Sequence, residues 1–280
     1  MVPIRLAESV MLLGRAQITT QALQLCLLHG VPIYYATRNG KLLGACFSHQ
    51  DGLLERRIRQ YNAYQNEARR LAIAKAFVRG KILAQMAMVR GYRRRIHNLA
   101  AQEKYFQQQL EAVRKTMTIS SLLGLEGETT KRYFANFSDM LLNVKWKGRN
   151  RQPPRDPVNA LLSLTYMMVL SQITTVCTGA GYEAGIGFLH DIQSKRPSLA
   201  CDFLELYRPM IDHFVIRLFN RGEVNESFFE KEGEGVLLKA ASFAVFMEKY
   251  DTFKSEHTDI YGRVALLGQA LKDGKAPDFG

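Results

Sequence analysis

The sequence predicts an α+β fold, in which a small β-rich N-terminal domain (residues 1–52) precedes a larger, mainly α-helical domain (residues 53–280). Two observations support this class. The first fifty residues are rich in turns and β-prone runs, whereas from about Leu53 the apolar residues recur with helical spacing. With 47% hydrophobic and 23% charged residues, the composition is that of a folded chain.

The N-terminal elements are predicted from short apolar runs. Residues 9–14 and 31–47 are β-prone, and Asn39-Gly40 lies between apolar residues, which is a hairpin signal. Between these runs the pattern predicts a short helix from Thr20 to His29, with Thr20 as its N-cap and Gly30 as its stop. A small mixed sheet is the expected result.

Helices are expected to dominate the rest of the chain. Helical spacing persists to residue 118, and a further helix is expected over residues 122–142. The segment from Lys145 to Val158 is the clearest loop, because its prolines and Gly148 break helices. The stretch from Pro157 to Tyr182 carries no charge, but its Asn, Ser, Gln and Thr residues make it too polar for a membrane span. We therefore expect a buried central helix there.

The positive charge is regional and predicts an anionic partner. The formal net charge is +12, and residues 51–100 carry twelve Lys or Arg against three acids, whereas residues 201–280 carry ten against fourteen. Nucleic acid is the first candidate for the partner and an anionic membrane the second.

Cysteine usage and the start of the chain favour a cytoplasmic location. Cys26, Cys46, Cys177 and Cys201 show no CxxC pairing and no spacing typical of a zinc site or a disulfide framework. No apolar segment with a cleavage site, as in a signal peptide, follows the first residues.

Two acidic residues close to a histidine suggest a divalent-metal site. Ser198 is a good N-cap for a helix that runs to about Phe219, on which Asp202 and Glu205 stand at positions i and i+3 and project from one face. Pro209 should bend this helix just beyond the pair, because it removes the backbone partner of the Glu205 carbonyl. His190 lies in the preceding loop. The alternative is a structural histidine beside a solvated acidic face.

Glu126 is the candidate for a remote partner of this pair. On a helix over residues 122–142 it shares an apolar stripe with Thr130, Tyr133 and Phe137, whereas Glu128 lies among charged residues. A carboxylate on an apolar stripe needs a cation or a hydrogen-bond partner to offset its desolvation.

Four motifs in a fixed order carry a family resemblance: LEG around Glu126, NALLSLTY from Asn159, GFLH ending at His190 and SLACDFLE from Ser198. Over about residues 10–263 the chain resembles the CRISPR-associated integrases, the catalytic subunits of spacer acquisition. Members of that family usually carry several more strands before the segment that matches residues 11–20. The resemblance therefore implies a shortened N-terminal domain, in a short variant or a piece of a fusion.

The resemblance also implies a site and a reaction. Glu126, His190 and Glu205 would be catalytic and would ligate the metal, with Asp202 either a weaker ligand or a residue that orients His190. The oxygen and nitrogen donors suit Mg²⁺ or Mn²⁺. The reaction would join the 3′-hydroxyl ends of a short DNA, the prespacer, to the CRISPR repeat by transesterification. Homodimers, two per complex, would act with a small companion subunit of ferredoxin-like fold.

Two basic segments are the expected DNA contacts. The first is the arginine-rich stretch of the long helices, where Tyr61, Tyr64 and Tyr92 could stack on bases. The second is the loop before residue 157, which also contains Arg151 and Arg155, and Lys195 and Arg196 could hold the scissile phosphate. The alternative is that these basic residues form a solvated helix face or a surface that binds an acidic protein. The residues selected are Arg56, Arg59, Arg69, Arg93, Arg94, Lys145, Lys147, Arg149, Lys195 and Arg196.

Two other functions stay open from the sequence. A metal-dependent nuclease that cuts branched or single-stranded DNA without joining it would use the same site. A non-catalytic DNA-binding scaffold would explain the basic charge, but the presence of all four candidate ligands argues against it.

Overall fold

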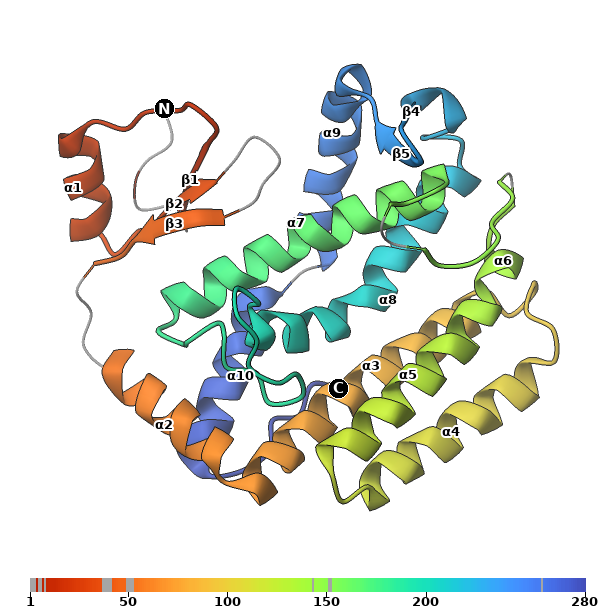
Figure 1. Cartoon of the computed structure of the whole chain (residues 1–280), viewed down its shortest axis with the longest axis horizontal. Coiled ribbons are helices and arrows are strands. Elements are labelled where there is room, and N and C mark those ends of the chain that lie inside the picture. Colours follow the sequence, from red (N-terminus) through yellow and green to blue (C-terminus); the bar gives the residue numbers. More distant parts are fainter. Residues whose placement is uncertain are drawn as a thin grey trace.

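The computed structural model describes residues 4, 7, 9–36, 42–48, 53–142, 144–150, 153–257 and 259–280. It confirms the predicted α+β class: a small sheet near the N-terminus is followed by a mainly helical region (Figure 1). The N-terminal sheet lies at one end of helix α7 (Pro157–Gly179), and the helices fill the rest of the molecule.

The N-terminal sheet has mixed strand directions, as predicted. Strand β1 (Val10–Leu13) pairs in parallel with β2 (Ile33–Ala36), which pairs in antiparallel fashion with β3 (Leu42–Cys46). Helix α1 (Thr20–Leu28) connects the two parallel strands, because parallel neighbours need a crossover connection. The predicted hairpin turn at Asn39-Gly40 lies outside the described residues.

The start of α1 differs by one residue from the prediction. The hydroxyl of Thr19, and not that of Thr20, accepts the backbone N–H of Ala22 at 3.2 Å, so Thr19 is the N-cap. Gly30 follows the helix with φ of 70°, a left-handed conformation that glycine adopts without a steric penalty.

In the helical region α3, α4 and α5 lie side by side, with α4 antiparallel to the other two, next to the central helices α7 and α8 (Figure 1). Helices α7 and α8 cross the centre, and α3 packs against α8 on one side and against α4 and α5 on the other. Their apolar residues share one large core. The helices are α2 (Leu53–Gln65), α3 (Glu67–Gly91), α4 (Leu99–Lys115), α5 (Ile119–Ala135), α6 (Phe137–Met140), α7, α8 (Ser198–Asn220), α9 (Ala240–His257) and α10 (Ile260–Asp273).

Helix α7 is the uncharged helix of the sequence, and it is a core helix here. By length and composition it could cross a membrane, but 56% of its most apolar window is buried inside the protein. It packs against α8 and α10. Asp156 caps its first turn by accepting the N–H of Asn159 at 2.8 Å, and Pro157 occupies the first helical position.

Strands β4 (Phe229–Glu232) and β5 (Gly235–Leu238) form an antiparallel hairpin that the helical expectation missed. Gly233 supplies the turn with φ of 58°. The hairpin is anchored to the loop before α7, because the N–H of Val236 donates to the carbonyl of Pro154 at 2.8 Å.

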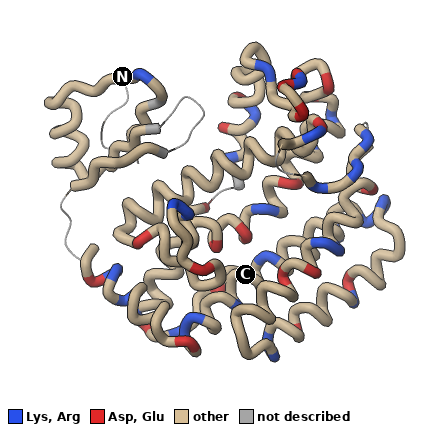
Figure 2. The backbone as a smooth tube through the Cα atoms, in the orientation of Figure 1, with Lys and Arg blue, Asp and Glu red and all other residues tan. Residues whose placement is uncertain are grey.

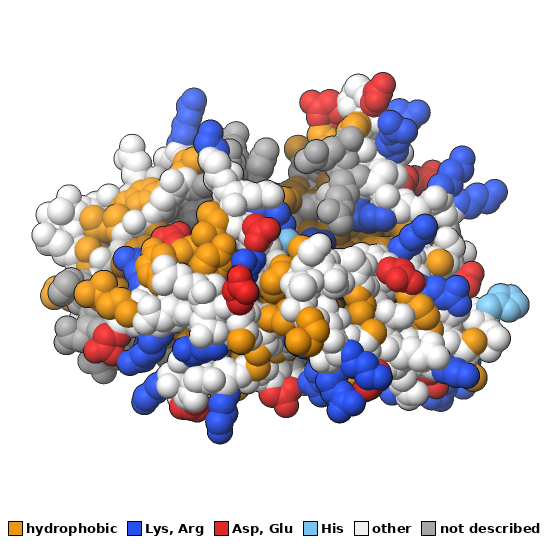
Figure 3. Space-filling view, turned by 60° about the horizontal axis from the view of Figure 1, so that its bottom comes forward, with side chains coloured by type: hydrophobic (Ala, Val, Ile, Leu, Met, Phe, Trp, Pro, Cys, Tyr) orange, Lys and Arg blue, Asp and Glu red, His pale blue; other side chains and the backbone are white. Residues whose placement is uncertain are grey.

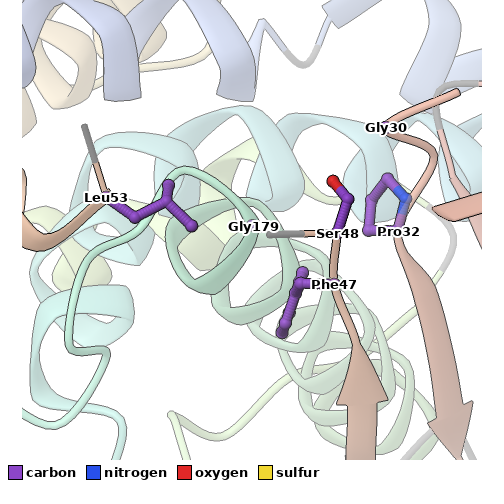
Figure 4. Close-up of a pocket in the computed structure, with 6 residues that line it drawn as sticks. All are labelled: Gly30, Pro32, Phe47, Ser48, Leu53 and Gly179. Atoms are coloured by element: carbon purple, nitrogen blue, oxygen red, sulfur yellow. The ribbon is translucent and has the colours of Figure 1, made fainter. Parts of the chain in front are cut away.

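The N-terminal sheet has its own small apolar cluster around Cys26, Val31 and Ile33. It contacts α7 through Tyr34, whose hydroxyl donates to the Thr175 carbonyl at 2.8 Å. A cavity of about 20 Å³ near this contact is lined by Leu53, Gly179 and residues just before β2 and just after β3, and it is only large enough for about one water molecule (Figure 4). The division at residue 52 stays a prediction, because residues 49–52 are not described.

Candidate active site

Three side chains from three helices meet at one buried point. The ammonium group of Lys81, on α3, contacts Oε1 of Glu126, on α5, and lies 2.5 Å from Oε2 of Glu205, on α8. Lys81 and Glu205 are buried, with 2% and 5% of their surfaces exposed, and Glu126 is partly buried. The two glutamates that were predicted to converge therefore do so, and a lysine holds them together.

The packing of α3 against α8 brings these groups within reach. Gly80 precedes Lys81, and a Cβ at Gly80 would lie 2.7 Å from the side chain of Leu206, the neighbour of Glu205. The absent side chain thus permits the close approach of the two helices. On α5, the hydroxyl of Thr130 donates to Oε1 of Glu126 at 2.9 Å and fixes that carboxylate on the inward stripe.

Arg208, one turn after Glu205 on α8, adds a second cation to Glu205. Its Nε donates to Oε1 of Glu205 at 2.8 Å. Burial by itself would raise the pKa of Glu205, but Arg208 and Lys81 outweigh burial and hold that pKa well below its usual range. Glu205 is therefore an anion that is held between two cations.

Asp202 holds the loop that carries His190. Its buried carboxylate accepts the backbone N–H groups of Phe188, Leu189 and His190 at 2.5, 3.0 and 3.0 Å, and it lies 2.7 Å from Nδ1 of His190. Of the two roles considered for Asp202, this geometry is that of a residue orienting His190. Nε2 is the ring nitrogen that is left for a ligand.

The motif GFLH packs tightly around this carboxylate. A Cβ at Gly187 would lie 2.8 Å from Oδ2 of Asp202 and 2.8 Å from the Ser198 backbone, so no larger residue fits there. Ser198 is the first residue of α8 and not its N-cap, because Pro197 takes that position. The Ser198 hydroxyl instead donates to the carbonyl of Asp191 at 2.8 Å. Helix α8 continues through Pro209 to Asn220.

The donor types fit a divalent cation, but their present arrangement holds a lysine. Two carboxylates converge on one cationic atom, and an imidazole nitrogen is positioned by Asp202, which is a donor set suited to Mg²⁺ or Mn²⁺. Within the described ranges, however, no three His, Cys, Asp or Glu side chains lie close enough together to hold a metal ion. The assignment of Glu126, His190 and Glu205 as ligands stays a prediction.

A buried polar group extends the site along α8. Asp212, two turns after Glu205, accepts the hydroxyl of Tyr166, and the guanidinium of Arg208 lies 4.7 Å from the centre of the Tyr166 ring. Arg149 lies over the same ring at 5.4 Å and donates to Asn159 at 2.9 Å. The site is thereby connected to the basic loop before α7.

Asp212 should make stability fall as the pH rises. Burial raises the pKa of Asp212 from 3.8 to about 6, because Tyr166 and Arg208 only partly offset its desolvation. The folded protein therefore binds a proton that the unfolded chain lacks between pH 4 and 6, and this stabilisation is lost as the pH rises through 6. Relative to Asp212→Asn, the wild type should lose about 2 to 3 kcal/mol of unfolding free energy between pH 4 and 7. Urea unfolding of both proteins at pH 4 and pH 7 measures the difference between their free energies of unfolding. The same difference at the two pH values would contradict the raised pKa of Asp212.

Several arginines of the predicted DNA-binding stretch have partners within the protein. Arg56 donates to the Ala180 carbonyl at 2.9 Å, Arg69 to the Leu271 carbonyl at 3.2 Å, and Arg59 pairs with Glu55 at 2.8 Å. Arg93 and Arg94 are exposed in the turn after α3. Figure 2 shows Lys and Arg along α2 and α3 and on the loop before α7, and in Figure 3 they gather along the lower edge.

The basic loop forms a groove with α5. Its volume is about 330 Å³, and Lys147 and Arg149 line it together with Lys131, which was not predicted. Aromatic side chains of Phe134 and Trp146 also line it. Lys145 and Lys195 are exposed and Arg196 is partly buried, whereas Arg151 lies outside the described residues.

Lys81 is the main site residue that the sequence analysis missed. A signal was present, because Lys81 follows the buried residues Ala74, Phe77 and Val78 at helical spacing and so lies on the apolar face of α3. A lysine on such a face needs an anionic partner. Tyr166 and Asp212 gave no comparable signal, since aromatic and acidic residues are common on half-buried helices.

Comparisons with known proteins agree with this fold. The family model described as "CRISPR associated protein Cas1" matches residues 1–252. A CRISPR-associated endonuclease Cas1 of Thermodesulfovibrio yellowstonii is 30% identical over 98% of this chain and 88% of its own. Among solved structures, a CAS1 protein from Thermotoga maritima has a TM-score of 0.80 at 20% identity, covering 98% of this chain and 88% of its own. A chain of a partial Cas6-RT-Cas1–Cas2 complex has a TM-score of 0.80 at 27% identity, covering 97% and 86%.

The fold, the paired glutamates and these matches define a CRISPR-associated nuclease or integrase. The family match spans nine-tenths of the sequence and includes all four motifs. The chain belongs to the Cas1 family.

Proposed function

We propose that the chain is a metal-dependent DNA integrase of CRISPR adaptation, which joins the 3′-hydroxyl ends of a prespacer to the CRISPR repeat by transesterification in the cytoplasm. The observation that carries the proposal is the convergence of Glu126 and Glu205 on one buried cationic point. Paired acidic oxygens from separate helices are suited to hold Mg²⁺ or Mn²⁺ beside a phosphodiester.

Each residue has a role that follows from its contacts. Glu126 and Glu205 would hold the ion, and His190 would complete the set through Nε2, because Asp202 occupies Nδ1. When bound, the ion would polarise the scissile phosphate and lower the pKa of the attacking hydroxyl. Arg208 is held beside Glu205, where it can offset negative charge on the phosphate.

The DNA would lie along the groove between the basic loop and α5. Lys131, Lys147 and Arg149 line that groove, and the contact between Arg149 and the Tyr166 ring connects it to Arg208 at the site. Phosphate contacts of this kind position a strand without reading its sequence. Arg93, Arg94, Lys145 and Lys195 are exposed and could extend the contact, as could Arg196.

A companion subunit would complete the active complex. The structural neighbour at 27% identity belongs to a complex whose name includes Cas2, and this supports a partner of that kind for the present chain. We propose a small companion of ferredoxin-like fold and two homodimers per complex. Mixing the purified chain with such a subunit, followed by light scattering, measures the stoichiometry.

Strand joining tests the proposed reaction directly. A labelled duplex with 3′-hydroxyl ends, incubated with the chain, its companion and Mn²⁺, should become attached to a supercoiled plasmid that carries a CRISPR repeat. The same duplex with 3′-deoxy ends should give no joined product, because the attacking oxygen is missing. Equal joining of the two duplexes, or joining in excess chelator, would contradict the proposal.

Hydrolysis without joining is the second candidate. The name of the relative from Thermodesulfovibrio yellowstonii, a CRISPR-associated endonuclease, favours this reaction. In that case the same assay would give cut plasmid, branched DNA would be cleaved, and no label would be transferred. A non-catalytic scaffold would give neither product and would not bind Mn²⁺ through Glu126.

A further inference from the structure

Lys81 occupies the point between the two glutamates that a metal ion would require. Its ammonium group contacts both carboxylates, and only 3% of its side chain is exposed. Lysine is almost never buried without an anionic partner, so these contacts are what keep the side chain inside. A cation already holds the site together.

The charges at this point are balanced without a metal. Lys81 and Arg208 carry two positive charges, and Glu126 and Glu205 carry two negative ones. A divalent ion added to all four groups would leave two uncompensated positive charges in a buried site, which is costly. Only one uncompensated positive charge remains if the Lys81 ammonium group leaves the two carboxylates when the ion binds.

We propose that Lys81 is a built-in competitor of the metal ion: it closes the site in the metal-free protein and must release Glu126 and Glu205 before a divalent ion can bind them. The inference rests on the proposed metal dependence. Lys81 thus lowers the metal affinity of the free protein and stabilises its empty site.

Calorimetric titration of the metal-stripped full-length chain with MnCl₂ tests this competition. Lys81→Met removes the charge and keeps a similar length, so Mn²⁺ should bind at least tenfold more tightly than in the wild type. Without metal, the same variant should melt at a lower temperature, because the buried Glu205 and the partly buried Glu126 lose a partner. Saturating Mn²⁺ should raise the melting temperature of the variant more than that of the wild type.

Lys75→Met is the matched control. Lys75 lies on the same helix, and its ammonium donates to the Arg114 carbonyl at 2.9 Å, away from both glutamates. Its Mn²⁺ affinity should equal that of the wild type. Equal or weaker binding by Lys81→Met would overturn the competition. Absence of Mn²⁺ binding in both the wild type and Lys81→Met would overturn the competition and the proposed metal dependence together.

Chemical labelling of the wild type gives a second test that does not depend on the folding of a variant. Reductive methylation, read out by mass spectrometry, should modify Lys81 faster in saturating Mn²⁺ than in chelator, because the released amine becomes accessible. Lys75 serves as the internal control and should react at the same rate in both. Unchanged or slower modification of Lys81 with Mn²⁺ would show that the lysine stays in place and would refute the competition.

Discussion

Replacing Glu205 or Glu126 by glutamine is expected to reduce strand joining by at least about a hundredfold, because each variant loses one of two carboxylate charges at the site. The two carboxylates contact the same ammonium group in the structure, so each variant removes one of the two negative charges around that point. The measurement is the initial rate of joining with Mn²⁺ at a saturating concentration of duplex.

Glu128→Gln is the control for this pair of variants. Glu128 lies on α5 only two residues from Glu126, but its side chain is exposed. Its joining rate should stay within about twofold of the wild type, since a surface charge contributes little. Circular dichroism melting separates lost catalysis from lost folding. A folded Glu205→Gln protein that joins DNA at the wild-type rate would show that Glu205 is not part of the catalytic site.

Replacing Asp202 by alanine is expected to destabilise the protein by about 3 to 5 kcal/mol. The carboxylate is fully buried and accepts three backbone N–H groups besides its contact with His190, and the variant leaves all of these donors without their acceptor. Urea unfolding at pH 7 measures the loss. Strand joining should also fall, because His190 loses the group that orients its ring.

Asp191→Ala controls for the loss of an acidic residue in the same loop. Asp191 pairs with Arg70 at 2.5 Å, but its side chain is 67% exposed. Its removal should cost less than about 1 kcal/mol. A similar cost for the Asp191 and Asp202 variants would mean that the buried hydrogen bonds of Asp202 do not hold the loop.

The sequence predicted those parts of the site that depend on local patterns. The i, i+3 spacing of Asp202 and Glu205 and the apolar stripe of Glu126 both follow from helical periodicity, and the structure has both. Periodicity places Lys81 on the apolar face of α3, but it could not identify the partners of Lys81, which lie 45 and 124 residues away. Arg56 and Arg69 were selected by charge alone, and the backbone carbonyls that they contact are invisible in a sequence.

For the fold as well, the sequence predicted elements that depend on local patterns and missed one that depends on a distant contact. The mixed sheet and the helical character of residues 53–118 were predicted, but the breaks between α2, α3 and α4 were not. The single helix expected over residues 122–142 is divided into α5 and α6 at Asn136. The hairpin of β4 and β5 was missed, because the chain around it is helical and each strand has only four residues. Its anchor, the carbonyl of Pro154, is far away in the sequence.

The site can form only when α3 and α8 pack closely at Gly80 during folding. Lys81 and Glu205 are 124 residues apart, so packing between helices that are adjacent in the sequence does not bring the pair together. Loop closure over such a separation costs entropy that only the assembled core repays. We therefore expect the proposed catalytic centre to form late in folding, when α8 docks on α3.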